Sequence, residues 1–213
     1  MSDPGILNPS FEGGDLSGWD KDGDGRVIMK LGKTGPVAGK FMSIISTGLG
    51  FTVETGSIQQ SFCIPAGVSE LSFFWKYYSE EFREWCGSEY QDTFQGTIVN
   101  RLGEQYHVVN LAVDDLCDKE DCDNAWDAWG SFATAAPALP TEARATCGSH
   151  YVGLAQSDVQ FDQGETWLTP WQRATFDVSK LAGAGPVTLR FFCTDKGDSI
   201  YDTAVLVDHI KFE

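Results

Sequence analysis

The sequence predicts an all-β protein, a jelly-roll-like β-sandwich with one long, cysteine-containing loop inserted in it. Three observations predict this fold. Short apolar segments of strand length recur along the 213 residues, and glycine, proline, aspartate and asparagine separate them. Long stretches with helical periodicity are missing almost everywhere. Many short strands joined by turns are typical of sandwiches and jelly rolls.

The expected strands share strand length, an apolar and aromatic content, and turn residues on both sides. In chain order they are 26–31, 40–46, 56–64, 70–78, 92–100, 105–113, 172–179, 186–194 and 204–212.

Alternation indicates which strand side chains face the core, because successive side chains of a strand point to opposite faces. In 70–78 the residues expected to share one face are Leu71, Phe73, Trp75 and Tyr77. In 186–194 the residues expected to point inward are Val187, Leu189 and Phe191.

Residues 114–150 differ from the rest of the chain. They are polar and rich in alanine and proline, and they hold three of the six cysteines. We interpret this segment as an insertion between strands, with a short helix over 124–132, because long loops in compact domains are often functional or tethered by disulfides. No repeat and no linker divides the chain, so 1–213 is expected to be one domain.

The charge is strongly acidic, with 31 Asp and Glu against 15 Lys and Arg and a formal net charge of −16. Such a chain repels phosphate backbones, so nucleic acid is not an expected partner. The acidity either serves solubility or marks carboxylates that hold divalent cations. No apolar run is long enough for a membrane span. The first residues lack the features of a signal peptide, so an exported protein would carry this chain as a mature or excised piece.

The six cysteines form no C-x-x-C pair, and the three histidines stand far apart, so zinc-site spacing is absent. Disulfides are one interpretation of the even count, and six reduced buried thiols are the other. The pairing that we favour joins Cys117 to Cys122 and Cys63 to Cys193, which leaves Cys86 and Cys147.

The stretch "GWDKDGDGRV" (18–27) is similar to the first half of an EF-hand calcium loop. Asp20, Asp22 and Asp24 alternate, and Gly25 follows them. The twelfth loop position, which requires a bidentate glutamate, is Leu31. The three aspartates therefore form either a peripheral calcium site or a simple acidic turn.

The two ends of the chain, "ILNPSFEGGDLSGW" and "AVLVDHIKFE", resemble those of the galactose-binding-like jelly rolls found in many carbohydrate-binding modules. The resemblance implies that the first and last strands are neighbours and that a structural calcium lies there, with Glu12 and Asp208 as ligands. The alternative is that Glu12 is an ordinary turn acid and Asp208 a solvent-facing strand residue.

A second resemblance rests on "SEEFREWCGSEYQDTF" (79–94) and "TDKGDSIYDTAVLVDHIKF" (194–212), together with "GRVIMKLG" and "GKFMSIISTG" earlier in the chain. These stretches resemble calcium-dependent β-sandwich domains of large bacterial surface adhesins and anchor-type secreted proteins. In such domains the "GDGRV" region is a strand-joining turn. The sequence departs from the family at Cys86, where valine is usual, and in the enlarged insertion.

Two acidic loops of this resemblance can supply oxygen ligands to calcium, and a cation would relieve the repulsion among their carboxylates. The predicted ligands are Glu81, Asp92, Asp198 and Asp202, followed by Glu80 and Asp195. The alternative is two separate solvated loops.

Three tryptophans are candidates for ligand contact: Trp85 beside the acidic loop, and Trp126 and Trp129 in the insertion, which could equally anchor the insertion to the sandwich. The other tryptophans with a clear context, Trp19, Trp75 and Trp171, are expected in the core.

The sequence thus predicts a calcium-dependent, extracellular or cell-surface module that binds a glycan or a peptide. A calcium-rigidified spacer is the first alternative. A polysaccharide-acting enzyme that pairs Glu81 with Asp92 or Glu84 is the second, but we do not expect an enzyme, because cation binding explains these carboxylates better.

Overall fold

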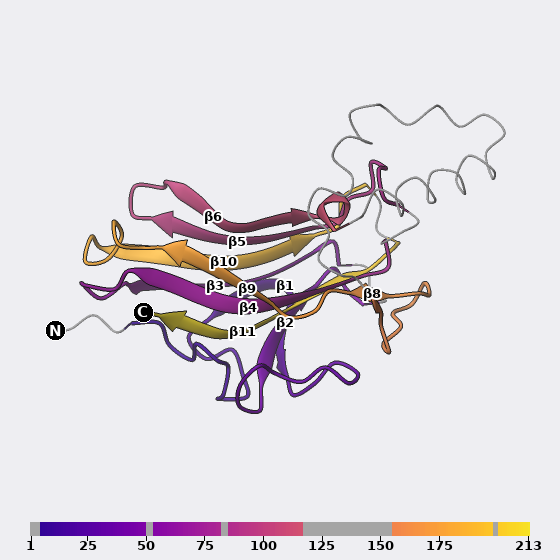
Figure 1. Ribbon diagram of the computed structural model, residues 1–213, viewed down its shortest axis with the longest axis horizontal. Coiled ribbons are helices and arrows are strands. Elements are labelled where there is room, and N and C mark those ends of the chain that lie inside the picture. The colour runs from indigo at the N-terminus through magenta and orange to yellow at the C-terminus, as the bar shows by residue number, and fades with distance from the viewer. Residues whose placement is uncertain (1–4, 50–52, 82–84, 117–154, 198–199) are drawn as a thin grey trace.

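The computed structural model describes residues 5–49, 53–81, 85–116, 155–197 and 200–213, and every structural statement below concerns these residues. The expected helix over 124–132 lies outside them, as do Glu84, Trp126, Trp129 and Asp198. Strands dominate the described part of the chain, and every strand pairing in it is antiparallel (Figure 1). The predicted all-β class is confirmed.

The strands have the following bounds: β1 Asp20–Ile28, β2 Met42–Ser46, β3 Thr55–Cys63, β4 Glu70–Ser79, β5 Thr93–Asn100, β6 Gln105–Ala112, β7 Ala155–Gln156, β8 Trp167–Leu168, β9 Gln172–Asp177, β10 Pro186–Thr194 and β11 Thr203–Phe212. A short 3-10 turn, η1 (Val113–Asp115), follows β6. No helix in these ranges is long and apolar enough to cross a membrane.

Each predicted strand corresponds to an observed one, and the two-residue strands β7 and β8 were not predicted. The expected turn at "GDGRV" is wrong. That stretch belongs to β1, which is already extended at Asp20 and continues to Ile28.

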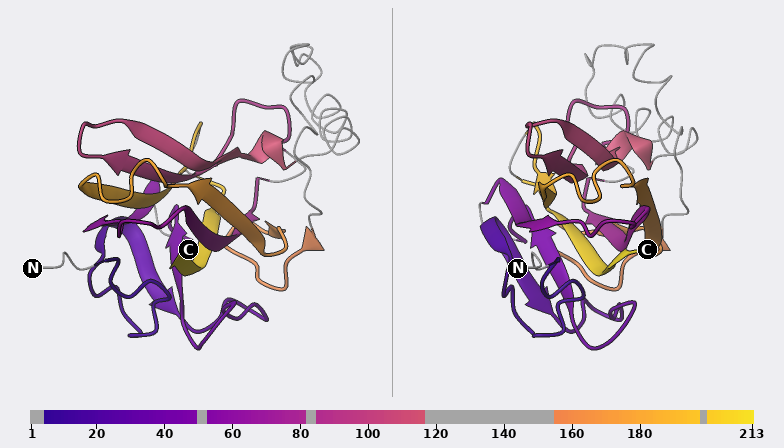
Figure 2. Two further views of the ribbon diagram at one scale, coloured as in Figure 1. Left: turned by 60° about the vertical axis from the view of Figure 1, so that its left-hand side comes forward. Right: turned by 90° about the vertical axis from the view of Figure 1, so that its left-hand side faces the viewer.

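Strand β1 joins the two layers of the sandwich. Its residues 20–23 pair with β3, and its residues 24–28 pair with β2. Layer A is β6-β5-β10-β3 with the first half of β1, and layer B is the second half of β1 with β2, β11, β4, β9, β8 and β7. Strands β5 and β6 lie at one margin of the molecule, and β1 and β2 lie at another (Figure 2).

The passage of β1 between the layers depends on two glycines that face each other in the register, Gly23 and Gly56. A Cβ on Gly23 would lie 1.9 Å from the carbonyl oxygen of Thr55. A Cβ on Gly56 would lie 2.4 Å from the carbonyl oxygen of Asp24 and 2.5 Å from that of Ser46. Only glycine allows these backbones to approach so closely.

The main core lies between the layers and contains every residue that alternation assigned to it. Rings from the two layers meet there, with the Phe73 and Phe191 centroids 4.9 Å apart and those of Trp75 and Phe94 5.7 Å apart. Trp19 is buried as expected. Trp171 is only partly buried and packs on a second cluster at Met42, Ile44, Tyr78, Ala204 and Leu206.

The predicted Cys63–Cys193 disulfide is wrong. Cys63 is opposite Pro186 and Cys193 is opposite Gly56, so the two cysteines lie at opposite ends of the β3–β10 pair. Seven residues of strand separate them by roughly 23 Å, whereas a disulfide requires Cα atoms within about 7 Å. The Cys117–Cys122 pairing and the remaining pair, Cys86 and Cys147, involve cysteines outside the described ranges and stay predictions.

We predict that Gly56→Ala lowers the free energy of unfolding by about 2 kcal/mol or more, because backbone atoms of two other strands occupy the space of the new methyl group. Gly35→Ala is the control, since no atom lies within 4 Å of a Cβ built there. Urea unfolding monitored by tryptophan fluorescence measures both. Equal midpoints for the two variants would contradict the account of the crossing.

Candidate metal centre

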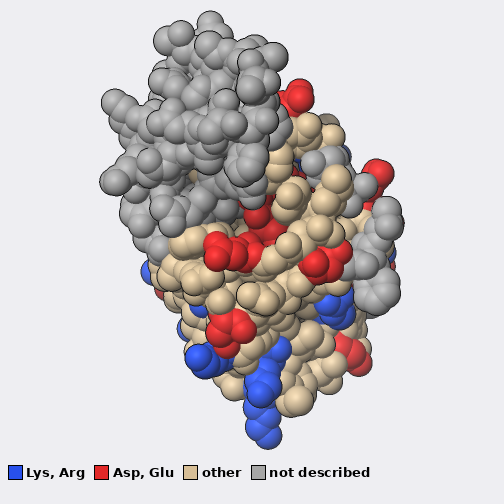
Figure 3. Space-filling view, turned by 90° about the vertical axis from the view of Figure 1, so that its right-hand side faces the viewer, with Lys and Arg blue, Asp and Glu red and all other residues tan. Residues whose placement is uncertain are grey.

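Acidic side chains gather at one end of the sandwich, which Figure 3 views directly. At this end Ser79, the last residue of β4, pairs with Thr203, the first of β11. Likewise Thr93 opens β5 opposite Thr194, the end of β10. The loops 80–92 and 195–202 therefore leave the two layers side by side, as the antiparallel pairing requires.

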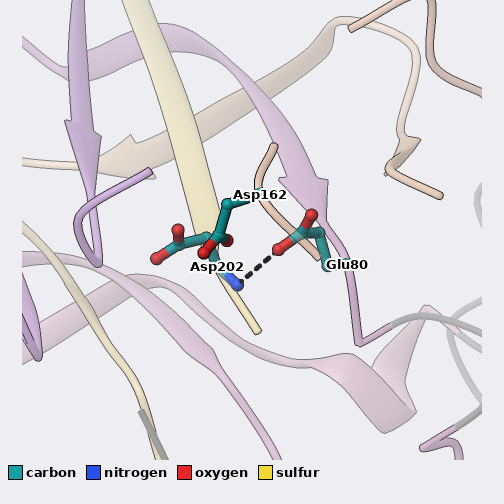
Figure 4. A group of neighbouring side chains, drawn as sticks. All are labelled: Glu80, Asp162 and Asp202. Atoms are coloured by element: carbon teal, nitrogen blue, oxygen red, sulfur yellow. Dashed lines mark hydrogen bonds between the residues drawn. The ribbon is translucent and has the colours of Figure 1, made fainter. Parts of the chain in front are cut away.

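Three carboxylates converge here: those of Glu80, Asp162 and Asp202, which we call the Glu80 cluster (Figure 4). One oxygen from each lies within 4.8 Å of the others. Glu80 and Asp202 are buried, with 5% and 8% of their surface exposed, and Asp162 is exposed. Within the described ranges, no other group of three or more acidic, histidine or cysteine side chains is as close.

Backbone donors from two loops fix the position of Glu80. Its Oε2 accepts a hydrogen bond from the Asp202 N–H at 3.0 Å. Its Oε1 accepts from the N–H groups of Gln163 and Gly164, at 3.0 and 3.1 Å. Burial raises the pKa of Glu80, these hydrogen bonds lower it in part, and the charge of Asp162 adds to the rise.

Asp202 is held from a third segment, the end of β2. The hydroxyl of Thr47 donates to Asp202 Oδ1 at 3.3 Å. The N–H of Thr203 donates to the same hydroxyl at 2.8 Å, so Thr47 positions both Asp202 and Thr203, the first residue of β11.

The Glu80 cluster fits a hard cation such as calcium. Its donors are all oxygens, and calcium–oxygen distances of about 2.3–2.6 Å mean that two ligands of one ion lie no more than about 5 Å apart. Two of the three carboxylates are buried, where like charges repel strongly and a cation relieves the repulsion. Calcium takes 6–8 oxygens, so carbonyls, water or a bound ligand would supply the remaining positions.

Glu81 follows Glu80 in the bend after β4, but its side chain contacts a different loop residue, Asp92. It is fully buried, as is Asp92, and its Oε2 accepts from the Asp92 N–H at 2.7 Å. The Lys196 N–H donates to Asp92 Oδ1 at 3.2 Å. Burial and the nearby charge of Asp92 hold the pKa of Tyr77 well above its ordinary value. The predicted ligands thus divide into two groups.

Of the remaining predicted ligands in these loops, Asp195 is half-buried just after β10, and its N–H donates to the carbonyl of Glu54 at 3.0 Å. The cluster contains one residue that the sequence analysis missed, Asp162. It lies in "VQFDQGETW", a loop without other signs of cation binding. Only the pairing of β8 with the end of β4 brings this loop beside Glu80.

Trp85 forms an aromatic cluster with Tyr90 and Tyr201. The ring centroids of Trp85 and Tyr90 are 4.9 Å apart, and those of Trp85 and Tyr201 are 5.6 Å apart. Tyr90 belongs to the loop 80–92 and Tyr201 to the loop 195–202. The three rings, all half-buried, therefore join the two acidic loops and leave part of their surface accessible.

Asp20, Asp22 and Asp24 lie on β1 rather than in a loop. Alternate residues of a strand are roughly 6.7 Å apart, too far for their carboxylates to converge readily on one ion. Asp24 is hydrogen-bonded to Arg26 and to Ser46, and the first two aspartates are exposed. Calcium binding at this strand stays a prediction.

Glu12 and Asp208 hold the same backbone segment, 37–41. Glu12 accepts from the N–H groups at 40 and 41, at 3.0 Å. Asp208 Oδ2 accepts from those at 37 and 38, at 2.7 and 3.1 Å, and burial raises the pKa of Asp208. The residues beside these two acids, Phe11 and His209, have φ of 58° and 56°, a strained conformation that often accompanies functional sites. A calcium between them also stays a prediction.

Comparison with known proteins gives a fold likeness. No protein-family model and no curated protein matches the sequence. Among solved structures, the carbohydrate-binding module TmCBM61, solved in complex with β-1,4-galactotriose, is similar with a TM-score of 0.50 and 13% identity over 98% of this chain and 96% of that one.

Two further structures have weaker similarity. The K1 cleaved adhesin domain of Lys-gingipain from Porphyromonas gingivalis W83 has a TM-score of 0.45 and 12% identity, over 96% of each chain. The enzymatically active domain of a bacteriophage CBA120 tailspike has a TM-score of 0.44 and 7% identity, over 97% of this chain and 21% of that one. The likeness to TmCBM61 supports the β-sandwich fold.

We predict a pH dependence that originates at Asp114, which anchors the loop of Trp85. Its Oδ1 accepts from Gly87 N–H at 2.6 Å and Gln91 Nε2 at 3.0 Å. Burial raises the pKa of Asp114 above its ordinary 3.8. The folded state therefore binds this proton more tightly than the unfolded state, and the resulting stability is lost as pH rises through the raised pKa.

Asp114→Asn keeps an oxygen for both donors and does not titrate. The free energy of unfolding of the wild type, minus that of this variant, should therefore fall as pH rises from 3 to 7. Urea denaturation at each pH measures the difference. A difference that is constant or increases with pH would contradict the assigned pKa shift.

Proposed function

We propose that this protein is an extracellular, calcium-dependent module that binds a glycan or a peptide, with its metal centre at the Glu80 cluster. The observation that carries the proposal is the convergence of Glu80, Asp162 and Asp202, two of them buried, with oxygens within 4.8 Å. Buried carboxylates so close together are costly unless protons or a cation compensate their charge.

Exposure of one side of the cluster favours ligand binding over a purely structural ion. Asp162 is exposed, so an ion bound beside it would be accessible from solvent. An ion with an open coordination position accepts sugar hydroxyls or a peptide carboxylate. The accessible rings of Trp85, Tyr90 and Tyr201 join the same loops and offer a surface for stacking.

The fold likeness to a module solved with β-1,4-galactotriose supports placing glycans first among the ligands to test. A rigidified spacer remains the competing function, because Glu80 also ties together the end of β4, the loop at 163–164 and the start of β11. The two functions differ in whether removal of calcium abolishes ligand retention.

Asp162→Asn provides the sharpest test of the metal centre. Because Asp162 is exposed and its charge repels that of Glu80, the variant should unfold in EDTA at the wild-type midpoint or slightly above it. It should lose most of the increase in unfolding temperature that calcium produces in the wild type, since one anionic ligand is gone. Glu165→Gln, an exposed acid on the same loop, is the control and should keep the full increase. A calcium response in Asp162→Asn equal to that of the control would contradict the assignment of Asp162 as a calcium ligand.

Trp85→Ala tests the binding surface separately. We expect retention on a glycan and peptide array in calcium to weaken at least about tenfold, because buried aromatic anchors dominate many binding sites. Trp85→Phe should retain an intermediate affinity, and calcium should raise the unfolding temperature of both variants. Unchanged retention by Trp85→Ala would remove the aromatic cluster from the site, and wild-type retention of neutral glycans that survives EDTA would contradict calcium dependence.

A further inference from the structure

The outer face of layer A is polar, in contrast to the apolar outer face of layer B. In layer B the residues Met42, Ile44 and Leu206 point outward and belong to the second cluster, on which partly buried side chains such as Phe161 and Trp171 pack. In layer A the outward positions of β3, β10 and β5 alternate with core residues such as Ile58, Leu189 and Phe94. They include Gln59, Ser61, Gln95, Thr188 and Arg190, which are all at least partly exposed.

Arg190 lies at the centre of this face. In the register it is opposite Gln59 of β3 on one side and Thr97 of β5 on the other. Its guanidinium carbon lies 4.6 Å from the ring centroid of Phe192, the next outward residue of β10. Stacking on the ring fixes the plane of the guanidinium before any ligand arrives.

No side-chain hydrogen bond of Arg190 is seen among the residues that the structure describes. Its Nε is buried without a hydrogen-bond partner, while the side chain as a whole is half-buried, so its terminal nitrogens face solvent. The ion pairs seen in the described ranges join Arg26 to Asp24 and Arg173 to Glu70, not Arg190 to an acid. Arg190 forms no ion pair in these ranges although the chain contains 31 acidic residues.

The acid nearest along the same row is Asp20, which is opposite Gln59. Two strand spacings, roughly 9.6 Å, separate its backbone from that of Arg190. A buried donor without a partner, such as Nε of Arg190, is costly. A planar carboxylate is the group whose two oxygens match the parallel donors of a guanidinium.

Amides and hydroxyls surround Arg190. Gln95 Nε2 donates to Asn110 Oδ1 at 2.9 Å, and the hydroxyls of Ser61 and Thr188 are 2.7 Å apart. These side chains are preorganised by each other and keep further donors and acceptors for a ligand. The neighbours of Arg190 on β3, β5 and β10 are neutral, and the acids of this face, Asp20 and Asp22, lie on β1, beyond β3. A central cation among amides and hydroxyls suits a ligand with one carboxylate and many hydroxyls.

We propose that the outer face of layer A is a second binding site, which takes a carboxylate-bearing saccharide. Arg190 binds the carboxylate, Phe192 holds the guanidinium in place, and Gln59, Gln95 and Thr188 bind hydroxyls. This site lies on a sheet face and contains none of the residues of the Glu80 cluster. It therefore goes beyond the proposed function and does not depend on it.

A glycan array that carries uronic-acid and sialic-acid oligosaccharides beside neutral ones tests the proposal, with the full chain applied in calcium. The wild type should retain acidic glycans in preference to neutral ones. Arg190→Gln should weaken this binding at least about tenfold by calorimetry on the strongest acidic glycan. Arg190→Lys, which keeps the charge but loses the planar fork, should fall between the two.

Two controls separate this site from the metal centre. Arg173→Gln removes an exposed arginine of layer B and should bind acidic glycans as the wild type does. Arg190→Gln should keep the increase in unfolding temperature that calcium produces in the wild type, because Arg190 is not part of the Glu80 cluster. Failure to prefer acidic glycans, unchanged binding by Arg190→Gln, or loss of acidic-glycan binding in Arg173→Gln would overturn the proposal. Absence of a calcium response in the wild type would overturn only the metal centre.

Discussion

The loop end of the sandwich depends on one buried carboxylate, that of Glu80. It accepts hydrogen bonds from three backbone N–H groups in two segments far apart in sequence, at Asp202 and at 163–164. These bonds fix where β11 begins and where the β7–β8 loop lies. The same burial raises the pKa of Glu80, so a cation beside this carboxylate would offset the cost of its charge.

The arrangement follows from where the strands β4, β5, β10 and β11 end. Glu80 and Glu81 follow the end of β4, and the carboxylate of the first accepts from the Asp202 N–H while that of the second accepts from the Asp92 N–H. The group at Glu81 is sealed from solvent, whereas the group at Glu80 includes the exposed Asp162. An ion at the first would only rigidify the loops, and an ion at the second could also contact a ligand.

Much of the fold was predictable because strand positions and core residues follow from local sequence patterns. Alternation in 70–78 and 186–194 assigned the core correctly, and turn residues marked the strand ends. The crossing of β1 was not predictable, since the glycines at 23 and 56 resemble turn residues until their partners are known. Asp162 was missed for the same reason. Its role depends on the pairing between β8 and β4, and a strand of two residues is too short to be predicted from sequence pattern. The Cys63–Cys193 disulfide failed because it required a register that sequence does not give.

The unequal outer faces show how one scaffold can offer two kinds of chemistry. Layer B buries its outer apolar residues under loops, which leaves the loop end and the polar face of layer A as accessible surfaces. The central claim is that the Glu80 cluster holds a cation. A crystal grown with a lanthanide in place of calcium tests it most directly, by anomalous scattering. The account predicts a strong anomalous peak within about 2.6 Å of carboxylate oxygens of Glu80, Asp162 and Asp202. A crystal in which that position holds no peak, while lanthanide binds elsewhere, would contradict it.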